Sequence, residues 1–354
     1  MSNSFFSSSS QRNANRVAFR NIYGAWNNTE GKILPIADVI KEAKCNYEVD
    51  KQTLVRITPA MLDAIRNGYP VEGLTQNDII TTHCATRRTD NDVTLGVVGN
   101  DYGVVQNEKA FEFIDYLQKY YGQESVIETA GALGDGERIY VTCRLKKEAY
   151  LDDSKKDPLN NYFIFTTSHD GGGSVKAYSS TIRVVCQNTL NQSLLKKADS
   201  LSYRHSKNVN ERLNYEVLVP KFIENSESLR QNFMIQMNKL RSEEVDANYV
   251  KDFAAQIFLK DTDYKEYLKA DRKIDDVDTI STRTRNQIEK LENSIDFGIG
   301  QEMYRGTKLW VLNGLTTMIH NDTEYKSEED EFLSIMEGTS AKRLEKAYKI
   351  LEIA

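Results

Sequence analysis

A His-Asp pair, His169 and Asp170, stands directly before three consecutive glycines in the stretch TTSHDGGGSVKAY. An imidazole and a carboxylate are side chains that often serve as general acids and bases. Adjacent residues of an extended chain point to opposite sides, however, so this pair is not placed to work as a dyad. Glycines between two strand-like runs are typical of a turn that needs positive φ angles. The pattern favours the bend of a β-hairpin over a catalytic loop.

The same turn has a second interpretation as an anion site. A glycine-rich turn can direct several backbone N–H groups at one anion, such as a phosphate. Both interpretations stay open on the sequence. The residues of this candidate turn or anion site are His169, Asp170, Gly171, Gly172 and Gly173.

Basic and aromatic residues alternate with apolar ones in GERIYVTCRLKK, residues 136–147. A period of two predicts an antiparallel strand with one face on a core and the other exposed. The run at 175–183 is expected to pair in the same sheet, although Lys176 and Arg183 alternate to opposite faces. The candidate nucleic-acid-binding residues are Arg138, Tyr140, Arg144, Lys146, Lys176, Tyr178 and Arg183.

Cations that follow phosphates and rings that stack on bases suit a single strand of nucleic acid. An ordinary solvated sheet face uses the same residue types and is the simpler alternative. Further basic residues flank the face in sequence: Lys155, Lys156, Lys196, Lys197, Arg204, Lys207 and Arg212.

Motifs of the common enzyme classes are absent from the sequence. It contains no GxxxxGK[ST], HExxH, GxSxG or GxGxxG, its four histidines are scattered, and its four cysteines form no CxxC pair. We therefore assign no catalytic residue, no metal and no cofactor. A binding protein is favoured over an enzyme, and an enzyme that uses His169, Asp170 and Asn188 is the last-ranked hypothesis.

The charge balance argues against binding of nucleic acid by overall attraction. The 354 residues carry 52 acidic and 46 basic side chains, a formal net charge of −6. Any nucleic-acid-binding surface must therefore be a local patch. No run of about 18 apolar residues could span a membrane, and isolated cysteines suit a reducing compartment. We expect a cytoplasmic protein without a membrane partner.

Changes in composition divide the chain into four segments, and the fold class that they predict is α+β. A central antiparallel β-sheet with flanking helices is followed by a mostly helical C-terminal half. The expected segments are a disordered Ser/Asn-rich arm at 1–30, an α+β core domain at 31–208, a helical region at 209–302, and C-terminal helices packing on the core at 303–354.

Local periodicities place several elements. The run ITPAMLDAIRNGY and the run NEKAFEFIDYLQKYYG have apolar residues at helical spacing, and IITTHCATRR with VTLGVVG predicts a hairpin. In the helical region one apolar stripe is expected to face the core. Its residues are Phe222, Leu229, Phe233, Met237 and Leu240.

Four segments of the chain resemble the phage/plasmid-like protein family built on a conserved domain of unknown function. They span about 80–320 and read CATRRTDNDVTLGVVGNDYGVVQNEKAFEFIDYL, ETAGALGDGERIYVTCRL, FTTSHDGGGSVKAYSSTIRVVCQNTL and TKLWVLNGLTTMIHN. The stretch 209–300 looks less like the family. The resemblance implies a protein of a phage, plasmid or other mobile element. The order of elements is also similar to that of phage single-strand annealing proteins, which is a fold-level analogy.

These observations lead to two expected functions. The first is a mobile-element protein in the host cytoplasm that binds single-stranded DNA on its basic sheet face, as a homo-oligomer, and anneals or recombines strands without NTP hydrolysis. The alternative is an anti-defence or interaction protein that contacts a host factor through its helical half, where the acidic stretch Glu324–Glu331 suits a basic partner.

Overall fold

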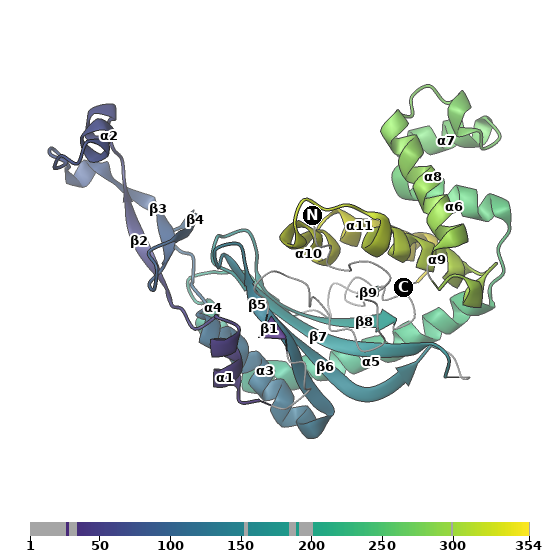
Figure 1. Cartoon of the computed structure of the whole chain (residues 1–354), viewed down its shortest axis with the longest axis horizontal. Coiled ribbons are helices and arrows are strands. Elements are labelled where there is room, and N and C mark those ends of the chain that lie inside the picture. Colours follow the sequence, from purple (N-terminus) through teal and green to yellow (C-terminus); the bar gives the residue numbers. More distant parts are fainter. Residues whose placement is uncertain are drawn as a thin grey trace.

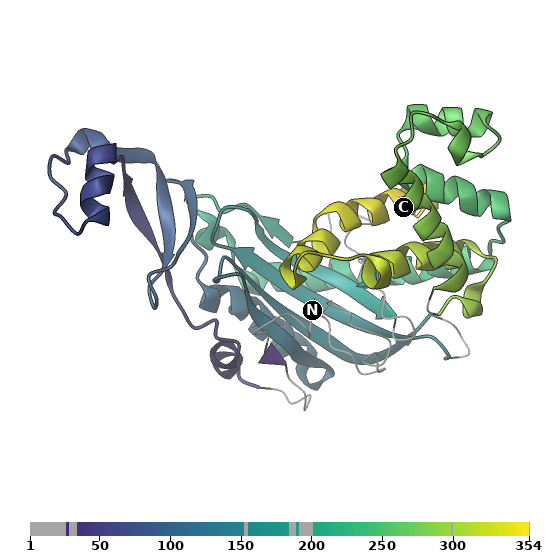
Figure 2. The ribbon, with the colours of Figure 1, turned by 45° about the horizontal axis from the view of Figure 1, so that its top comes forward.

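The computed structural model of the chain describes residues 26–27, 34–151, 155–183, 189–190, 201–298 and 300–353. A central β-sheet lies between two layers of helices, and a slender arm projects from one end of it (Figures 1 and 2). The disordered segment expected at 1–30 lies outside the described residues, apart from 26–27.

The central sheet is antiparallel and runs in the order β1-β5-β6-β7-β8-β10, with β9 paired to β8. Its middle strands β5 to β8 form a meander in which each strand pairs with the next along the chain. The strands of this sheet are β1 (Trp26–Asn27), β5 (Ser125–Leu133), β6 (Arg138–Tyr150), β7 (Pro158–Ser168), β8 (Val175–Arg183), β9 (Thr189–Leu190) and β10 (Leu201–Tyr203).

One face of the sheet packs on helices that precede and follow its long strands in the sequence. These are α1 (Ile36–Glu42), α3 (Asn107–Tyr121), α4 (Val209–Arg212) and the first half of α5 (Tyr215–Ser242). The Phe113 ring lies 4.9 Å from that of Phe165 and 5.3 Å from that of Phe222, joining α3, β7 and α5. The alternation in β6 correctly predicted the residues on this face, which are Ile139, Val141, Cys143 and Leu145.

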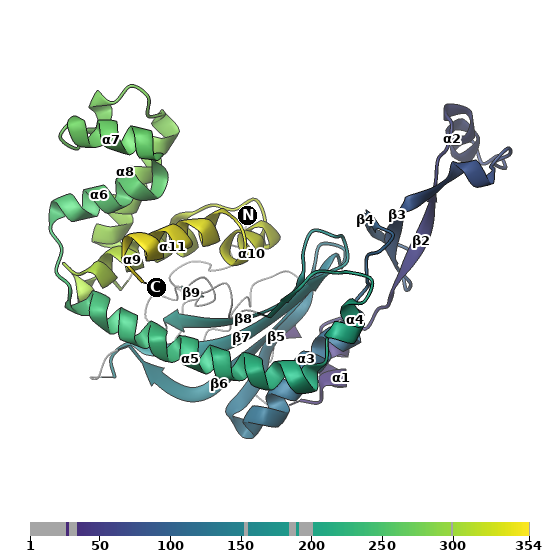
Figure 3. The ribbon, with the colours of Figure 1, turned by 180° about the vertical axis from the view of Figure 1, so that it is seen from behind.

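The chain then leaves along α5 and returns over the opposite face of the sheet (Figures 1 and 3). The helices of this half are α6 (Ala247–Phe258), α7 (Asp261–Lys269), α8 (Thr282–Phe297), α9 (Lys308–Thr317), the π-helix η8 (Met318–Asp322), α10 (Glu328–Met336) and α11 (Thr339–Ile350). Short 3-10 turns lie at η3 (Gly122–Glu124), η6 (Ile274–Asp276) and η7 (Glu302–Tyr304).

A second hydrophobic cluster joins these helices to the sheet. It includes Tyr140 of β6, Tyr178 of β8 and Phe332 of α10, and the rings of Tyr140 and Phe332 are 5.5 Å apart. The stripe predicted for α5 is buried throughout, and its second half belongs to this cluster. The expected α+β class, with a central antiparallel sheet and helices mostly in the C-terminal half, is confirmed.

The projecting arm consists of residues 49–99, which we call the β-arm. It is a three-stranded antiparallel sheet, β2-β3-β4, that carries one helix at its far end (Figure 1). The predicted hairpin and the predicted helix are both present. The elements are β2 (Val49–Val55), α2 (Pro59–Arg66), η2 (Gln76–Asp78), β3 (Ile79–Arg88) and β4 (Thr94–Gly99).

Candidate anion-binding site

The triple glycine forms the turn between β7 and β8, as the sequence predicts. Gly171 has φ +78°, a backbone conformation that favours glycine. The Gly172 N–H donates to Oδ1 of Asp170 over 2.7 Å, so the Asp170 carboxylate closes the turn on itself.

The turn is also the joint between the central sheet and the β-arm. A Cβ on Gly96 of β4 would lie 2.6 Å from the Cα of Asp170, which leaves no room for a side chain at this position. The Thr86 hydroxyl of β3 donates to the His169 carbonyl over 2.6 Å. The backbone of the His-Asp-Gly segment therefore packs directly on the arm.

His169 is a structural residue of this joint. Its Nε2 lies 2.8 Å from Oδ1 of Asn107. The Asn107 amide nitrogen donates to the carbonyls of Cys45 and Tyr47, so the amide oxygen must accept and Nε2 must carry the proton. Burial, with a smaller contribution from His205, lowers the pKa of His169 to about 3. A buried, neutral imidazole at physiological pH is unsuited to bind an anion or to transfer protons.

A cleft of about 360 Å³ opens beside the turn. It is built by the turn itself, the start of β8, the segment after β10, the loop before α3 and the residue that follows α10. The residues that line it are Tyr102, Gly171, Gly172, Gly173, Ser174, Lys176, Arg204, His205 and Glu337.

Strand pairing explains why Arg204 reaches the cleft. β10 pairs with β8 so that Ser202 lies opposite Lys176 and Tyr203 opposite Val175. The next residue, Arg204, therefore comes alongside the end of the turn. Arg204 is exposed, and within the described part of the chain its guanidinium has no hydrogen-bond or ion-pair partner.

Lys176, by contrast, is already paired. Its Nζ lies 2.6 Å from Oε2 of Glu337, and Oε1 of Glu337 accepts from the Tyr178 hydroxyl over 2.8 Å and from Arg138 over 3.4 Å. Burial alone would raise the pKa of Glu337, but Lys176, Tyr178 and Arg138 together hold it below the usual value. Glu337 is therefore ionised at neutral pH and compensates the cations around it.

His205 completes the wall of the cleft without adding charge. Its ring stacks on that of Tyr102 at 4.6 Å, and its Nδ1 lies 2.9 Å from the Gly103 carbonyl. Burial lowers the pKa of His205, so the imidazole is neutral at physiological pH. Among the described residues that line this cleft, Arg204 is thus the one cation without a partner.

The expectation that Arg138, Tyr140, Lys176 and Tyr178 form a solvent-exposed face is wrong. Tyr140 is 0% exposed and Arg138 and Tyr178 are each 6% exposed, because the C-terminal helices cover this face of the sheet. The alternating basic and aromatic side chains meet Phe332 and Glu337 instead of solvent. Of these four residues, Lys176 alone is among the described residues that line the glycine-turn cleft.

The other three candidate residues on the sheet have different surroundings. Arg144 pairs with Glu128, which also accepts from the Tyr162 hydroxyl, so its charge is satisfied inside the protein. Lys146 is exposed near the far end of β6. Arg183, at the end of β8, pairs through its backbone with Leu159 of β7, and its side chain is outside the described part of the structure.

Sequence reasoning missed four members of the cleft, which are Tyr102, Ser174, His205 and Glu337. Tyr102 and Glu337 reach it from segments more than 200 residues apart, and no local pattern marks either of them. Arg204 was recognised only as a basic residue that flanks the strand in sequence. The signal that could have found it was the short β-like run before it, which brings it beside the glycine turn.

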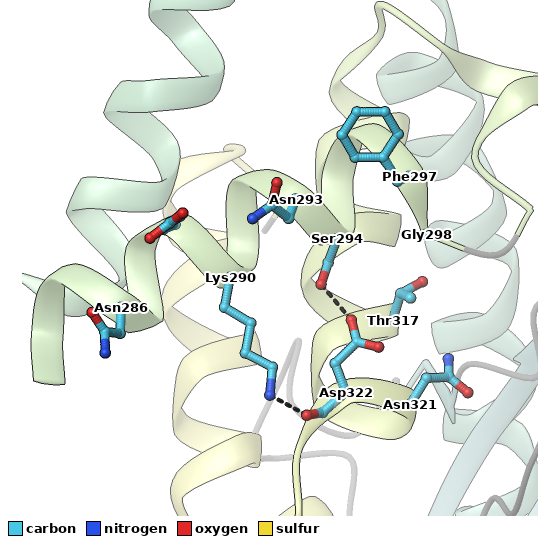
Figure 4. Close-up of a pocket in the computed structure, with 10 residues that line it drawn as sticks. Asn286, Lys290, Asn293, Ser294, Phe297, Gly298, Thr317, Asn321 and Asp322 are labelled. Atoms are coloured by element: carbon cyan, nitrogen blue, oxygen red, sulfur yellow. Dashed lines mark hydrogen bonds between the residues drawn. The ribbon is translucent and has the colours of Figure 1, made fainter.

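A larger groove lies in the helical half, between α8 and η8, with a volume of about 600 Å³ (Figure 4). The Asp322 carbonyl accepts from Lys290 and its carboxylate from Ser294, which ties the π-helix to α8. Phe297 stands at the rim and is 81% exposed. The remaining lining residues are Asn286, Glu289, Asn293, Gly298, Thr317 and Asn321.

Among the described residues, no three His, Cys, Asp or Glu side chains are grouped so that they could hold a metal ion. No helix in the same part of the chain has the length and apolar character needed to cross a membrane.

Comparison with known families identifies the chain. The family described as Domain of unknown function (DUF932) matches residues 94–338, and the chain belongs to this family. No curated protein and no solved structure matches the chain. Every residue that lines the glycine-turn cleft falls inside the matched segment, whereas β2, α2 and β3 of the arm precede it.

Proposed function

We propose that the chain binds single-stranded DNA by holding a backbone phosphate in the glycine-turn cleft. The proposal rests on the exposed guanidinium of Arg204, which lies beside the triple-glycine turn and Lys176 and has no partner among the described residues. A guanidinium presents a planar fork of N–H donors that matches the oxygens of a phosphate. The surface is therefore smaller than the sheet face that the sequence suggests and lies at its edge.

The charges in the cleft favour modest, salt-sensitive binding. Glu337 compensates Lys176 and Arg138, so an incoming phosphate gains chiefly from Arg204 and partly from Lys176. Each phosphate contact with a basic side chain releases counterions, and affinity then falls as salt rises. A flexible single strand can lead one phosphate into a cleft of about 360 Å³, whereas a duplex presents its phosphates on a rigid convex surface.

The biological setting follows from the sequence resemblance. A mobile-element protein that holds single strands in the host cytoplasm is suited to strand annealing during recombination, which needs no NTP hydrolysis. This proposal needs neither a metal nor a nucleotide cofactor.

Fluorescence anisotropy with a labelled oligothymidylate, measured from about 50 to about 200 mM salt, tests the proposal. We expect saturable binding that weakens with salt and exceeds binding to a duplex of equal length. A folded sample that binds no single strand at the lowest salt would refute it.

A second candidate function rests on the groove in the helical half. An 81% exposed Phe297 beside the carboxylates of Glu289 and Asp322 suits an extended segment of a partner protein that carries apolar and basic residues. A host factor is such a partner. A pull-down from host lysate tests this function. The wild-type chain should retain a protein that the Phe297→Ala variant does not; the same proteins retained by both would count against it.

A further inference from the structure

The β-arm has almost no interior of its own. No residue from Asp50 to His83 is buried, although the structure describes all of them. α2 has no fully buried residue either: Met61 and Leu62 are partly buried, and Ile65 is 50% exposed. This absence of burial distinguishes the far part of the arm from the base, where Cys84 and Leu95 are buried.

Large apolar side chains collect on this part of the arm. Between Val55 and Ile80 seven of them are exposed, whereas exposed large apolar residues are scattered over the rest of the described chain. The seven residues are Val55, Ile57, Ile65, Tyr69, Leu74, Ile79 and Ile80. We call residues 55–80 the arm tip.

A tip of this kind is poorly stabilised in isolation. A two-stranded ribbon is only marginally stable in water, and an eight-residue helix is far shorter than a helix that forms alone. The helix is nevertheless well defined, because Thr58 caps its start and Pro59 occupies its first turn. A concentration of exposed large apolar side chains on one short segment is typical of an interface.

The charges of the arm argue against a nucleic-acid or strongly charged partner. Arg56 pairs with Asp78 over 2.7 Å, and Arg66 lies 3.9 Å from Asp63. At the base, Arg87 contacts Asp50 and Asp92, and Arg88 contacts Asp90. Both arginines of the tip are therefore paired within it, and Glu72 leaves the tip with a formal net charge of only −1.

We propose that the tips of two copies of this chain pack against each other across a two-fold axis and form a homodimer. An apolar surface whose arginines pair with its own carboxylates can pack on a second copy of itself, and two-fold dimers are the commonest symmetric assembly. The tip spans residues 55–80, which is about the 20–30 residues that each partner contributes to a standard interface. The α2 helices, with Ile65 and Tyr69, lie at the centre of the contact. This dimer does not depend on the DNA-binding proposal.

The oligomeric state of the full chain, measured by sedimentation equilibrium, tests the proposal. Wild type is expected at twice the chain mass. Ile65→Asp with Tyr69→Asp buries charge in the interface and should raise the dimer dissociation constant about 100-fold or more. Ile235→Asp is the matched control. Ile235 is also in a helix and is 64% exposed, against 50% for Ile65, but it lies on α5, away from the arm. The dissociation constant of the Ile235→Asp dimer should equal that of the wild type.

A variant with a shortened arm tests the proposal even if the point variants fail to fold. Val55 and Ile79 are directly paired, so an Asn-Gly turn in place of residues 56–78 can close the hairpin between them. This variant should be a folded monomer with an unchanged far-ultraviolet spectrum for the body. A wild-type chain that stays monomeric at about 50 μM, or a shortened chain that still dimerises, would overturn the proposal.

Discussion

Lys176 and Glu337 lie 2.6 Å apart, Nζ to Oε2, although they are far apart in sequence. Lys176 is at the start of β8 and Glu337 directly follows α10. The ion pair fastens the C-terminal helices over the sheet at the edge of the glycine-turn cleft. The same ion pair therefore stabilises the packing of the C-terminal helices on the sheet and reduces the positive charge that Lys176 presents to a ligand in the cleft.

Glu337→Gln should destabilise the fold while strengthening anion binding. The substitution leaves Lys176 and Arg138 without their carboxylate in a largely buried setting, and we expect a loss of about 2 kcal/mol in the free energy of unfolding. Urea denaturation measures the loss. Glu345→Gln is the control, because its exposed i, i+4 pair with Lys349 is worth little. In the anisotropy assay the freed Lys176 should tighten binding to single-stranded DNA; weaker binding would be contrary to our account.

His169 should make the fold sensitive to mild acid. In the unfolded chain its imidazole takes up a proton below about pH 6.5, whereas the folded pKa is about 3. The unfolded state therefore binds the proton first, and the free energy of unfolding falls as pH drops through this range. From pH 7.5 to 5.0 this site should remove roughly 2 kcal/mol.

His169→Gln should abolish that part of the pH dependence, as followed by urea denaturation at the two pH values. His83→Gln, at an exposed position on β3, serves as the control and should behave as wild type. Parallel pH profiles for wild type and His169→Gln would show that the imidazole is not held neutral.

Gly96 should be intolerant of even one methyl group. Its Cβ would lie 2.6 Å from the Cα of Asp170, a backbone atom that cannot move without shifting the turn. We expect Gly96→Ala to cost about 1–3 kcal/mol in thermal or urea unfolding. Gly99→Ala on the same strand has open space around its Cβ and should be nearly neutral. Equal effects of the two substitutions would argue that the arm does not rest on the turn.

Features set by neighbouring residues could be predicted from the sequence. The core face of β6 and the buried stripe of α5 follow from periods of 2 and 3.6, and the glycine turn follows from backbone conformation. The helix α2 was also predicted from its apolar spacing. That spacing suggests a helix packed on a core, yet in this chain the helix lies at the tip of the arm and none of its residues is fully buried.

Features set by distant residues could not be predicted. The alternation of Arg138 and Tyr140 is the same for a solvated face and for a face covered by helices, and only Phe332 and Glu337 decide between the two. Arg204 is likewise one of several basic residues until the pairing of β10 with β8 places it beside the turn. The candidate site thus depends on tertiary contacts that no local pattern contains.

The most direct test of the DNA-binding proposal compares Arg204→Ala with Lys207→Ala in the salt-dependent anisotropy assay. Both variants remove one exposed positive charge from the same segment, but only Arg204 lines the cleft. Our account predicts that Arg204→Ala weakens binding to single-stranded DNA at least about tenfold and lowers the salt slope by about 0.7, while Lys207→Ala stays close to wild type. Equal, small effects of the two variants would contradict a phosphate site at the glycine turn.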